Sequence, residues 1–240
     1  MGRILVDLSR PISHMMPVAN PHFNQVPAFW DRVTHAGLQG RWRHADISFH
    51  IRDFLIGEHV GTHVDALCHY DPRPEAPCLD QLPLDLFMTE AVCVDVSHRQ
   101  PGTFVTLQDL KQGLEGANLS IQKGDTLLYW QNYYARSHEP NWLQEFAGLD
   151  WDAAQWLADQ GVVNIGCECA SIDSSAAMPF DADPAFPAHR TCRERGMLNT
   201  ENLANLDKVV GRRFVYIGFP LRLVGGTGSP IRAVAVLEDA

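Results

Sequence analysis

The sequence predicts a mixed α/β fold, with a barrel-like or layered β core and several flanking helices. Short apolar or alternating segments, which are typical of strands, recur from the first residues to the last. Two segments between them carry helix start and stop signals. The chain has 240 residues, no internal repeat and no linker. This length fits one domain that buries roughly 70% of its unfolded surface, so we expect a single domain over residues 1–240.

The expected strands are of two kinds. In some, apolar and polar residues alternate, so that Ile47, Phe49 and Ile51 share one side of a strand. Others are short apolar runs, typical of a strand that is buried on both faces. The predicted strands are residues 3–8, Ala45–Leu55, Glu90–Ser97, Asp125–Gln131, Val162–Cys167, Phe214–Phe219 and Ile231–Leu237.

Capping residues define two helices. Thr106 is placed to cap a helix that ends near Gly116. Asp150 is placed to cap a second helix through Asp159, with Gly161 just beyond its C-terminus. A predicted strand follows directly, which gives a helix-then-strand unit.

The connecting segments differ in character. Residues 70–89 contain four prolines and read as a connector. Residues 11–28 form a polar loop, including His22, that either lines a pocket or wraps the surface. Residues 171–195 show little periodicity, and long segments of this kind are often active-site loops. The glycine run at 225–230 lacks the lysine and the following helix of a phosphate loop, so we expect a turn near the pocket.

The composition is that of an ordinary soluble globular protein. A net charge of −10 without a basic patch argues against nucleic acid as a partner. There is no run of eighteen apolar residues, so we expect no membrane span, and the N-terminus reads as a strand rather than a signal peptide. Six cysteines without a CxxC pair favour reduced thiols in a cytoplasmic protein.

The densest group of reactive side chains lies between His59 and His69, where three imidazoles and one carboxylate are spaced His-x3-His-x-Asp-x3-His. Imidazole nitrogens and carboxylate oxygens are donors that hold divalent transition metals. An isolated histidine usually lies on the surface or in the core with a satisfied hydrogen bond. Three histidines with an aspartate in one short window predict a metal site.

The spacing also predicts the shape of this segment. A straight helix would place His59 and His63 on one face but turn Asp65 away. A straight strand would align all four side chains but spread them over roughly 33 Å. The segment must therefore bend, and Gly61 is best able to provide the bend because it has no Cβ. We predict a curled strand or loop that carries His59, His63 and Asp65 inward.

A second candidate pair lies far downstream. His189 precedes Glu201 by twelve residues. Thr200 reads as an N-cap, which would place Glu201 in the first turn of a helix, where a negative charge is favoured. On this interpretation alone, Glu201 complements the helix dipole.

With both regions in view, the sequence resembles the cyclase family of metal-dependent hydrolases, which includes bacterial kynurenine formamidase and isatin hydrolase. The family signature His-x-Gly-Thr-His-x-Asp-x-Pro-x-His is matched from His59 to His69, with Leu67 in place of the proline. A later histidine followed by Glu-Asn-Leu is matched by His189 and Glu201–Leu203. Weaker echoes at Val6–Ile12, Gly166–Asp173 and Leu221–Ala233 extend the resemblance over nearly the whole chain.

The resemblance implies one or two divalent metals per chain. His59, His63 and Asp65 would hold the first metal, and Asp65 and Glu201 would bridge to a second held by His189. Zinc is the usual metal, and manganese is the alternative because histidine and carboxylate ligands discriminate weakly between metals.

The resemblance also implies an acid/base, a fold and an assembly. His69 would be the catalytic acid/base. The fold would be the swivelling β/β/α type, usually in a homodimer or higher homo-oligomer in which a neighbour contributes to the pocket. The aromatic stretch Tyr129–Tyr134 and Trp142 are candidates for such an interface or for the core.

The ligands indicate hydrolysis of a small-molecule substrate. A divalent metal lowers the pKa of bound water and polarises a carbonyl oxygen. The expected substrate is an amide, imide or lactone, cyclic or aromatic, with His69 moving the proton. Kynurenine formamidases carry a tryptophan soon after Met-Pro-Val. Here Met16-Pro17-Val18 is followed by Ala19-Asn20-Pro21, which argues against formylkynurenine itself.

Other functions are weaker alternatives. A metal-dependent cyclase or dehydratase could use the same scaffold. A non-catalytic metal protein would not need His69 beyond its ligands. There is no Gly-x-Ser-x-Gly motif of a serine hydrolase. Cys68 and His69 are neighbours that would point apart on an extended chain, and Cys167 and Cys169 read as core thiols rather than ligands.

Overall fold

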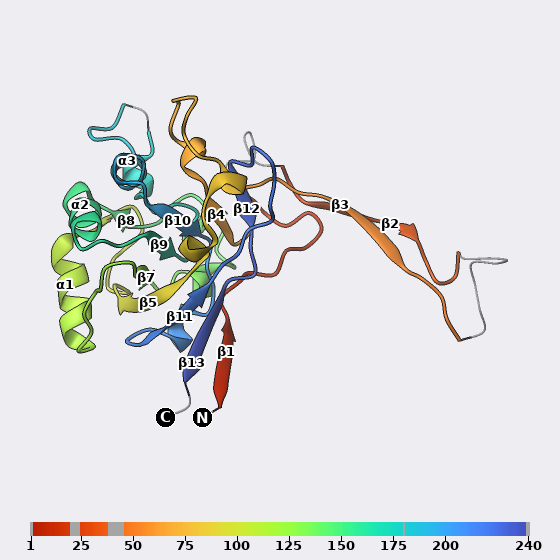
Figure 1. Cartoon of the computed structure of the whole chain (residues 1–240), viewed down its shortest axis with the longest axis horizontal. Helices are drawn as coiled ribbons and strands as arrows, with labels where there is room; N and C mark the ends of the chain where they lie inside the picture. The colour runs from red at the N-terminus through yellow and green to blue at the C-terminus, as the bar shows by residue number, and fades with distance from the viewer. Residues whose placement is uncertain (1, 20–24, 38–45, 180, 239–240) are drawn as a thin grey trace.

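A nine-stranded mixed sheet forms the centre of the fold, and the three α-helices of the described residues pack against one face of it (Figure 1). The computed structural model describes residues 2–19, 25–37, 46–179 and 181–238. The predicted mixed α/β fold is confirmed. In spatial order the strands are β1 (Arg3–Asp7), β13 (Val234–Glu238), β11 (Arg213–Ile217), β5 (Met88–Asp95), β7 (Thr126–Trp130), β9 (Asn164–Cys167), β10 (Leu198–Glu201), β4 (His63–Asp65) and β12 (Gly228–Pro230).

Strand direction divides this sheet into three parts. Strands β5, β7, β9 and β10 run parallel to one another. Strands β4 and β12 continue antiparallel from β10, and strands β11, β13 and β1 continue antiparallel from β5. The parallel part therefore meets an antiparallel part between β10 and β4.

The central strands are buried on both faces. Val92 and Leu127 belong to the apolar cluster beneath the helices, whereas Ala91 and Leu128 belong to a second cluster on the opposite face. All four are 0% exposed. Successive side chains of a strand point to opposite faces, and a strand covered on both faces is apolar throughout. This explains the continuous apolar run predicted at Glu90–Ser97.

Two helices begin and end where the sequence predicts. Helix α1 (Leu107–Gly116) follows Thr106, whose side chain accepts a hydrogen bond from a backbone N–H of the first turn. Helix α2 (Trp151–Asp159) follows Asp150, which accepts such a bond at 2.7 Å. Gly161 lies just beyond it with φ +81°. Both caps satisfy amides that a helix start leaves without partners.

The third helix departs from the prediction. Helix α3 (Pro187–Arg195) occupies the end of residues 171–195, so the prediction of one long loop there is wrong. Pro187 is the first helical residue, where its fixed φ and missing N–H favour a helix start. Gly196, with φ +69°, ends the helix. None of the helices in the described residues is long and apolar enough to cross a membrane.

Two short sheets lie outside the main one. Strands β6 (Phe104–Val105) and β8 (Gly148–Leu149) pair in parallel. Strands β2 (Ala28–Val33) and β3 (Ile51–Leu55) form an antiparallel arm that projects from the body (Figure 1). Of the strand predicted at Ala45–Leu55, the second half is confirmed. Ala45 lies outside the described residues, as do His22, Asn20 and Pro21.

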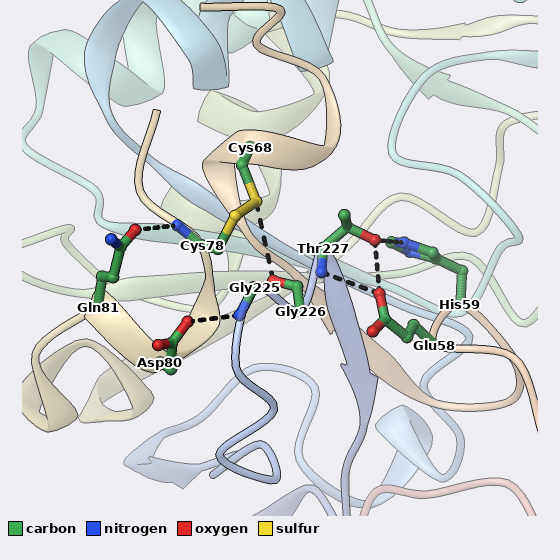
Figure 2. The surroundings of a disulfide bond; sticks show 9 residues. All are labelled: Glu58, His59, Cys68, Cys78, Asp80, Gln81, Gly225, Gly226 and Thr227. Carbon is green, nitrogen blue, oxygen red and sulfur yellow. Dashed lines mark hydrogen bonds between the residues drawn. A yellow bond between two sulfur atoms is a disulfide. The ribbon is translucent and has the colours of Figure 1, made fainter. Parts of the chain in front are cut away.

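Cys68 and Cys78 form a disulfide, so the prediction of six reduced thiols is wrong for this pair (Figure 2). The chain doubles back between them, and the Cys68 N–H donates to Pro77 O at 3.2 Å. Their separation of ten residues carries no recognisable motif, which is why the sequence did not indicate the bond. Cys167 and Cys169 are free and 0% exposed, which confirms them as core thiols.

The aromatic residues that were candidates for an interface lie mainly in the core. Tyr129, Tyr133 and Trp142 are at most 6% exposed and belong to the cluster beneath the helices. Trp130 is partly buried against the cluster on the other face. The core interpretation is confirmed for these side chains.

Candidate metal centre

The predicted bend in the histidine-rich segment is confirmed at Gly61, which has φ +70°. Other residues avoid this left-handed region, and a Cβ here would lie 3.0 Å from Ile12 Cγ1. The chain after the bend forms β4, which ends in Asp65. His59 lies before the bend, and its Nδ1 comes to 2.7 Å from Asp65 Oδ1. The two ends of the segment thus meet as predicted.

Glu201 reaches the same place from a strand, so the prediction that it begins a helix is wrong. It ends β10, which pairs with β9 on one side and β4 on the other. In the register with β4, Glu201 lies opposite His63, and Asn199 lies opposite Asp65. Pairing on both sides outweighs the capping preference of Thr200. The cross-strand pairs place both carboxylates at one edge of the parallel sheet.

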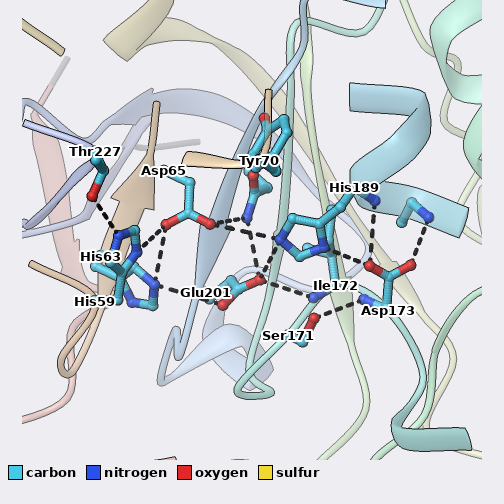
Figure 3. A network of polar contacts seen from close by, with 12 residues as sticks. His59, His63, Asp65, Tyr70, Ser171, Ile172, Asp173, His189, Glu201 and Thr227 are labelled. Atoms are coloured by element: carbon cyan, nitrogen blue, oxygen red, sulfur yellow. Dashed lines mark hydrogen bonds and ion pairs between the residues drawn. The ribbon is translucent and has the colours of Figure 1, made fainter. Parts of the chain in front are cut away.

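His189 approaches from α3. Its Nδ1 lies 2.5 Å from Asp173 Oδ2. Its Nε2 points to the two buried carboxylates, 3.6 Å from Glu201 Oε1 and 3.7 Å from Asp65 Oδ2 (Figure 3). The structure therefore brings all five predicted ligands together, namely His59, His63, Asp65, His189 and Glu201.

Hydrogen bonds determine which imidazole nitrogen carries the proton. His63 Nδ1 lies 2.9 Å from Gly61 O, and a carbonyl can only accept, so this nitrogen donates. The other nitrogen, Nε2, faces Asp65 Oδ1 at 3.3 Å and Glu201 Oε2 at 3.6 Å, and it would offer its lone pair to a metal that displaced its proton. His189 follows the same logic, because Asp173 accepts from its Nδ1. The Nε2 atoms of two rings therefore face carboxylates, and a cation bound between them would take the place of the protons.

The pKa values of the charged groups in the centre also favour a bound cation. Burial and the negative charge of Asp65 raise the pKa of Glu201 to about 7. Burial acts to lower the pKa of His63, but the hydrogen bond and charge of Asp65, with Glu201, raise it to about 9. Burial opposes ionisation of Asp65 as well, yet hydrogen bonds from His189, His59 and His63 hold its pKa well below the usual range. A centre that attracts protons this strongly is suited to a divalent cation.

The described residues contain two groups of donors within metal-binding reach. One is His59, Asp65 and His69, and the other is His63, Asp65 and Glu201, with donor atoms within 4.8 Å of one another in each group. Nitrogen and carboxylate oxygen donors of this kind fit zinc and related metals. Asp65 belongs to both groups, so it lies at the heart of the candidate centre.

His69 lies at the exposed rim of the centre. Its ring stacks on that of His59, with centroids 3.9 Å apart. Although His69 is exposed at the rim, the protein packed beside its ring removes enough water to lower its pKa to about 4, with Asp65 opposing and the neighbouring imidazoles acting in the same direction. The ring is therefore neutral near pH 7 and able to accept a proton.

The local structure around His69 differs from the expectation. Leu67, which replaces the family proline, begins a short 3-10 helix that ends at His69, so this part of the chain is not extended. Cys68 is joined to Cys78, and a disulfide sulfur is not a free nucleophile. The cysteine–histidine nucleophile is therefore excluded for this form of the protein.

Several supporting residues were missed by the sequence analysis. Asp173 orients His189, Thr227 lies 3.0 Å from His59 Nε2, and Asn199 Nδ2 donates to Asp65 at 2.8 Å and to Glu201 at 3.2 Å. A period of two in a strand would have placed Asn199 beside Glu201. The turn expected near the pocket at residues 225–230 carries Thr227, but no motif indicated its contact with His59, which is 168 residues away.

A buried arginine joins the two strands of the centre from behind. The Arg10 N–H donates to Thr62 Oγ1 at 2.8 Å, and its guanidinium donates to Asn202 Oδ1 at 2.6 Å. Thr62 Oγ1 in turn donates to Asn202 O at 2.6 Å. The guanidinium also lies 4.1 Å from the centre of the Trp142 ring. These contacts link the residues next to His63 and Glu201.

Buried nitrogen and oxygen donors beside a neutral imidazole are typical of metal-dependent enzymes. The candidate site therefore places the protein in that class. A family model described as "Putative cyclase" matches residues 6–174. Kynurenine formamidase of Salinibacter ruber is 31% identical over 236 residues, which cover 98% of each chain. The chain therefore belongs to the cyclase family and is a metal-dependent hydrolase, as the sequence predicts.

Solved structures share the fold. The crystal structure of an isatin hydrolase bound to the product analogue thioisatinate has a TM-score of 0.84 and 23% identity, over 99% of this chain and 93% of the other. A predicted metal-dependent hydrolase from Bacillus stearothermophilus has a TM-score of 0.70 and 24% identity, over 98% and 99%. At these identities the likeness confirms the fold. Among the activities considered, the relatives do not favour a cyclase or dehydratase.

Proposed function

We propose that residues 1–240 act as one domain that hydrolyses an amide, imide or lactone of a small cyclic or aromatic substrate. The observation that carries this proposal is the convergence of imidazole nitrogens on the two buried carboxylates, Asp65 and Glu201. The kynurenine formamidase and isatin hydrolase relatives support an amide or imide beside an aromatic ring.

In this proposal His59, His63 and Asp65 hold one metal, and His189 and Glu201 with Asp65 hold a second if two are bound. Zinc is the first choice and manganese the alternative. When bound, the metal supplies Lewis acidity that polarises the carbonyl and lowers the pKa of a water ligand.

The acid/base role falls to His69. Its neutral ring lies within reach of the donors of the centre, and the residue is exposed to solvent. It takes the proton of the attacking water and returns it to the leaving nitrogen or oxygen. The stacked ring of His59 keeps its plane fixed.

The first test is metal content by elemental analysis, together with acid release from formanilide, isatin and an unsaturated lactone. We expect the unmodified protein to hold about one or two zinc or manganese ions per chain and to hydrolyse at least one substrate. We expect His63→Ala to lose both properties. A protein prepared without chelator that binds no metal would contradict the proposal, and metal without acid release would favour another chemistry. Turnover of formylkynurenine in the same assay would identify the specific alternative.

We also propose that the chain forms a homodimer through the arm of β2 and β3. Trp30, Ile51, Phe54 and Leu55 on this arm are between 47% and 66% exposed. An isolated two-stranded ribbon is marginally stable, and clustered exposed apolar side chains mark association surfaces. A second copy of the chain would cover this surface, and β3 leads directly toward the candidate metal centre.

Light scattering after gel filtration tests this assembly. We expect the unmodified protein to be a dimer, and Phe54→Ser to weaken the dimer at least about tenfold because an apolar contact is lost. Val224→Ser removes another exposed apolar side chain, 91% exposed and away from the arm, and it serves as the control. A monomeric unmodified protein, or a dimer indifferent to Phe54→Ser, would contradict the proposed arm contact.

The proposed location is the cytoplasm. Four buried free thiols agree with it, whereas the Cys68–Cys78 disulfide argues against it because cytosolic disulfides are rare outside redox sensing or catalysis. Alkylation of free thiols in intact cells distinguishes a cytoplasmic location from an oxidising compartment. A bridge that is reduced in cells supports the cytoplasm, and a fully oxidised bridge supports an oxidising compartment.

A further inference from the structure

Thr227 and Glu58 form a relay that ends on His59. Thr227 Oγ1 lies 3.0 Å from His59 Nε2 and 2.6 Å from Glu58 Oε2. The Thr227 N–H also donates to Glu58 Oε2, at 2.9 Å (Figure 2). These contacts join residues that lie 169 positions apart in the sequence.

The number of protons fixes the direction of the relay. Glu58 Oε2 already accepts from the Thr227 N–H at 2.9 Å, so the same oxygen also acts as the acceptor for the Thr227 hydroxyl 2.6 Å away. The single hydroxyl proton of Thr227 therefore goes to Glu58, and Oγ1 must accept from His59 Nε2–H. With Nε2–H directed at Thr227, Nδ1 is the nitrogen of His59 that faces Asp65 Oδ1, at 2.7 Å, and that would bind a metal placed there.

The backbone around Thr227 leaves the His59 ring little freedom. A Cβ at Gly228 would lie 2.4 Å from His59 Cε1, so the chain at the start of β12 packs flat against the ring. The His59 ring is also stacked against the His69 ring, with centroids 3.9 Å apart. Only glycine allows this close approach of backbone to imidazole.

The turn that carries Thr227 is itself held from several directions. The Ala66 N–H donates to Thr227 O at 2.8 Å, and the Leu79 N–H donates to Gly226 O at 3.0 Å. The Gly225 N–H donates to Asp80 Oδ1 at 2.9 Å (Figure 2). The hydroxyl of Thr227 is thus placed before any ligand binds, which reduces the loss of entropy when His59 binds a metal.

The other two imidazoles are oriented in the same way, because the outer nitrogen of each ring donates to a fixed acceptor. His63 donates to the carbonyl of Gly61, and His189 donates to the carboxylate of Asp173. We propose that Thr227 and Glu58 are positioning residues that select the tautomer of His59 and aim its Nδ1 at the metal. This inference rests on the proposed role of His59 as a ligand. Partners of this kind, which orient a ligand through its outer nitrogen, typically change metal affinity 10- to 100-fold.

The test measures zinc affinity by competition with a chromogenic chelator, on metal-free protein of verified thermal stability. Thr227→Val keeps the shape of the side chain and removes the hydroxyl, and we expect zinc binding to weaken roughly 10- to 100-fold. Glu58→Gln should weaken it in the same direction. Thr227→Ser restores the hydroxyl and should bind zinc within about threefold of the unmodified protein. Thr103→Val, which removes a hydroxyl bonded to Gln100 O on an exposed turn, is the matched control.

The outcomes separate this inference from the proposed function. If Thr227→Val binds zinc normally while His59→Ala does not, the relay is wrong and the metal centre stands. If Thr227→Ser fails to restore affinity, the residue acts only through packing and the inference is wrong. If His59→Ala and His63→Ala both bind zinc like the unmodified protein, the proposed metal centre itself is wrong.

Discussion

Asp65→Asn is expected to remove the metal and to lower turnover by at least roughly 1,000-fold, more than the loss of one oriented donor in other enzymes. Asp65 is 1% exposed, and its two oxygens face different partners. Oδ1 lies beside His59 and His63, and Oδ2 lies beside His189 and the amide of Asn199. Asparagine keeps the size of the side chain but removes the charge that both donor groups share.

The measurement combines elemental analysis after dialysis with initial rates on whichever substrate the unmodified protein turns over. Asp125→Asn is the matched control, because Asp125 is 2% exposed and pairs with Arg213 at 2.9 Å away from the centre. It should lower thermal stability and leave the metal content unchanged. An Asp65→Asn protein that retains both metal and turnover would rule out Asp65 as the shared ligand.

The second large effect is expected at Gly148 in β8. A Cβ there would lie 2.1 Å from the carbonyl carbon of Asp173 and 2.2 Å from Ser174 N. These are backbone atoms, so no rotamer change relieves the collision. Gly148→Ala is therefore expected to lower the free energy of unfolding by at least about 3 kcal/mol, at the upper end of overpacking effects. For a chain of this size this corresponds to a fall of roughly 6–12 °C in Tm.

The same substitution should disturb the metal centre from a distance. Asp173 Oδ1 accepts from the Ala188 N–H at 2.6 Å and Oδ2 holds His189, so a displaced Asp173 loosens the start of α3. Calorimetry and zinc affinity are the measurements. Gly116→Ala is the control, since a Cβ at the end of α1 meets nothing within 4 Å, and alanine favours a helix. Equal stability of the two variants would show that β8 can shift without cost.

Contacts between residues close in the sequence could be predicted, whereas contacts between residues far apart in the sequence could not. The bend at Gly61 and the meeting of His59 with Asp65 follow from spacing within one short segment, and both are confirmed. The fold class and the capped helices α1 and α2 likewise depend on local patterns. The contacts of Thr227 with His59 and of Asn199 with Asp65 could not be foreseen, because they span 168 and 134 residues.

The errors have two physical causes: tertiary contacts that the sequence pattern does not show, and a local helix-start signal that was overlooked. Thr200 has the chemistry of a helix cap, yet β9 and β4 pair on both sides of it and hold a strand. Residues 171–195 were expected to form a loop, but Pro187 starts α3, because the first helical residue needs no N–H partner. Cys68 and Cys78 approach each other only because the proline-rich connector doubles back.

The junction between β10, β4 and β12 has a consequence for the order of folding. Strand β4 lies between two strands that come from the last third of the sequence, and it has no other neighbour in the sheet. Contacts between residues so distant in the chain form slowly, since a long loop must close before they stabilise anything. The histidine-rich segment therefore cannot take its final shape until the C-terminal strands arrive. A metal should accordingly bind only after the C-terminal strands have folded onto β4, and not to a folded N-terminal half alone.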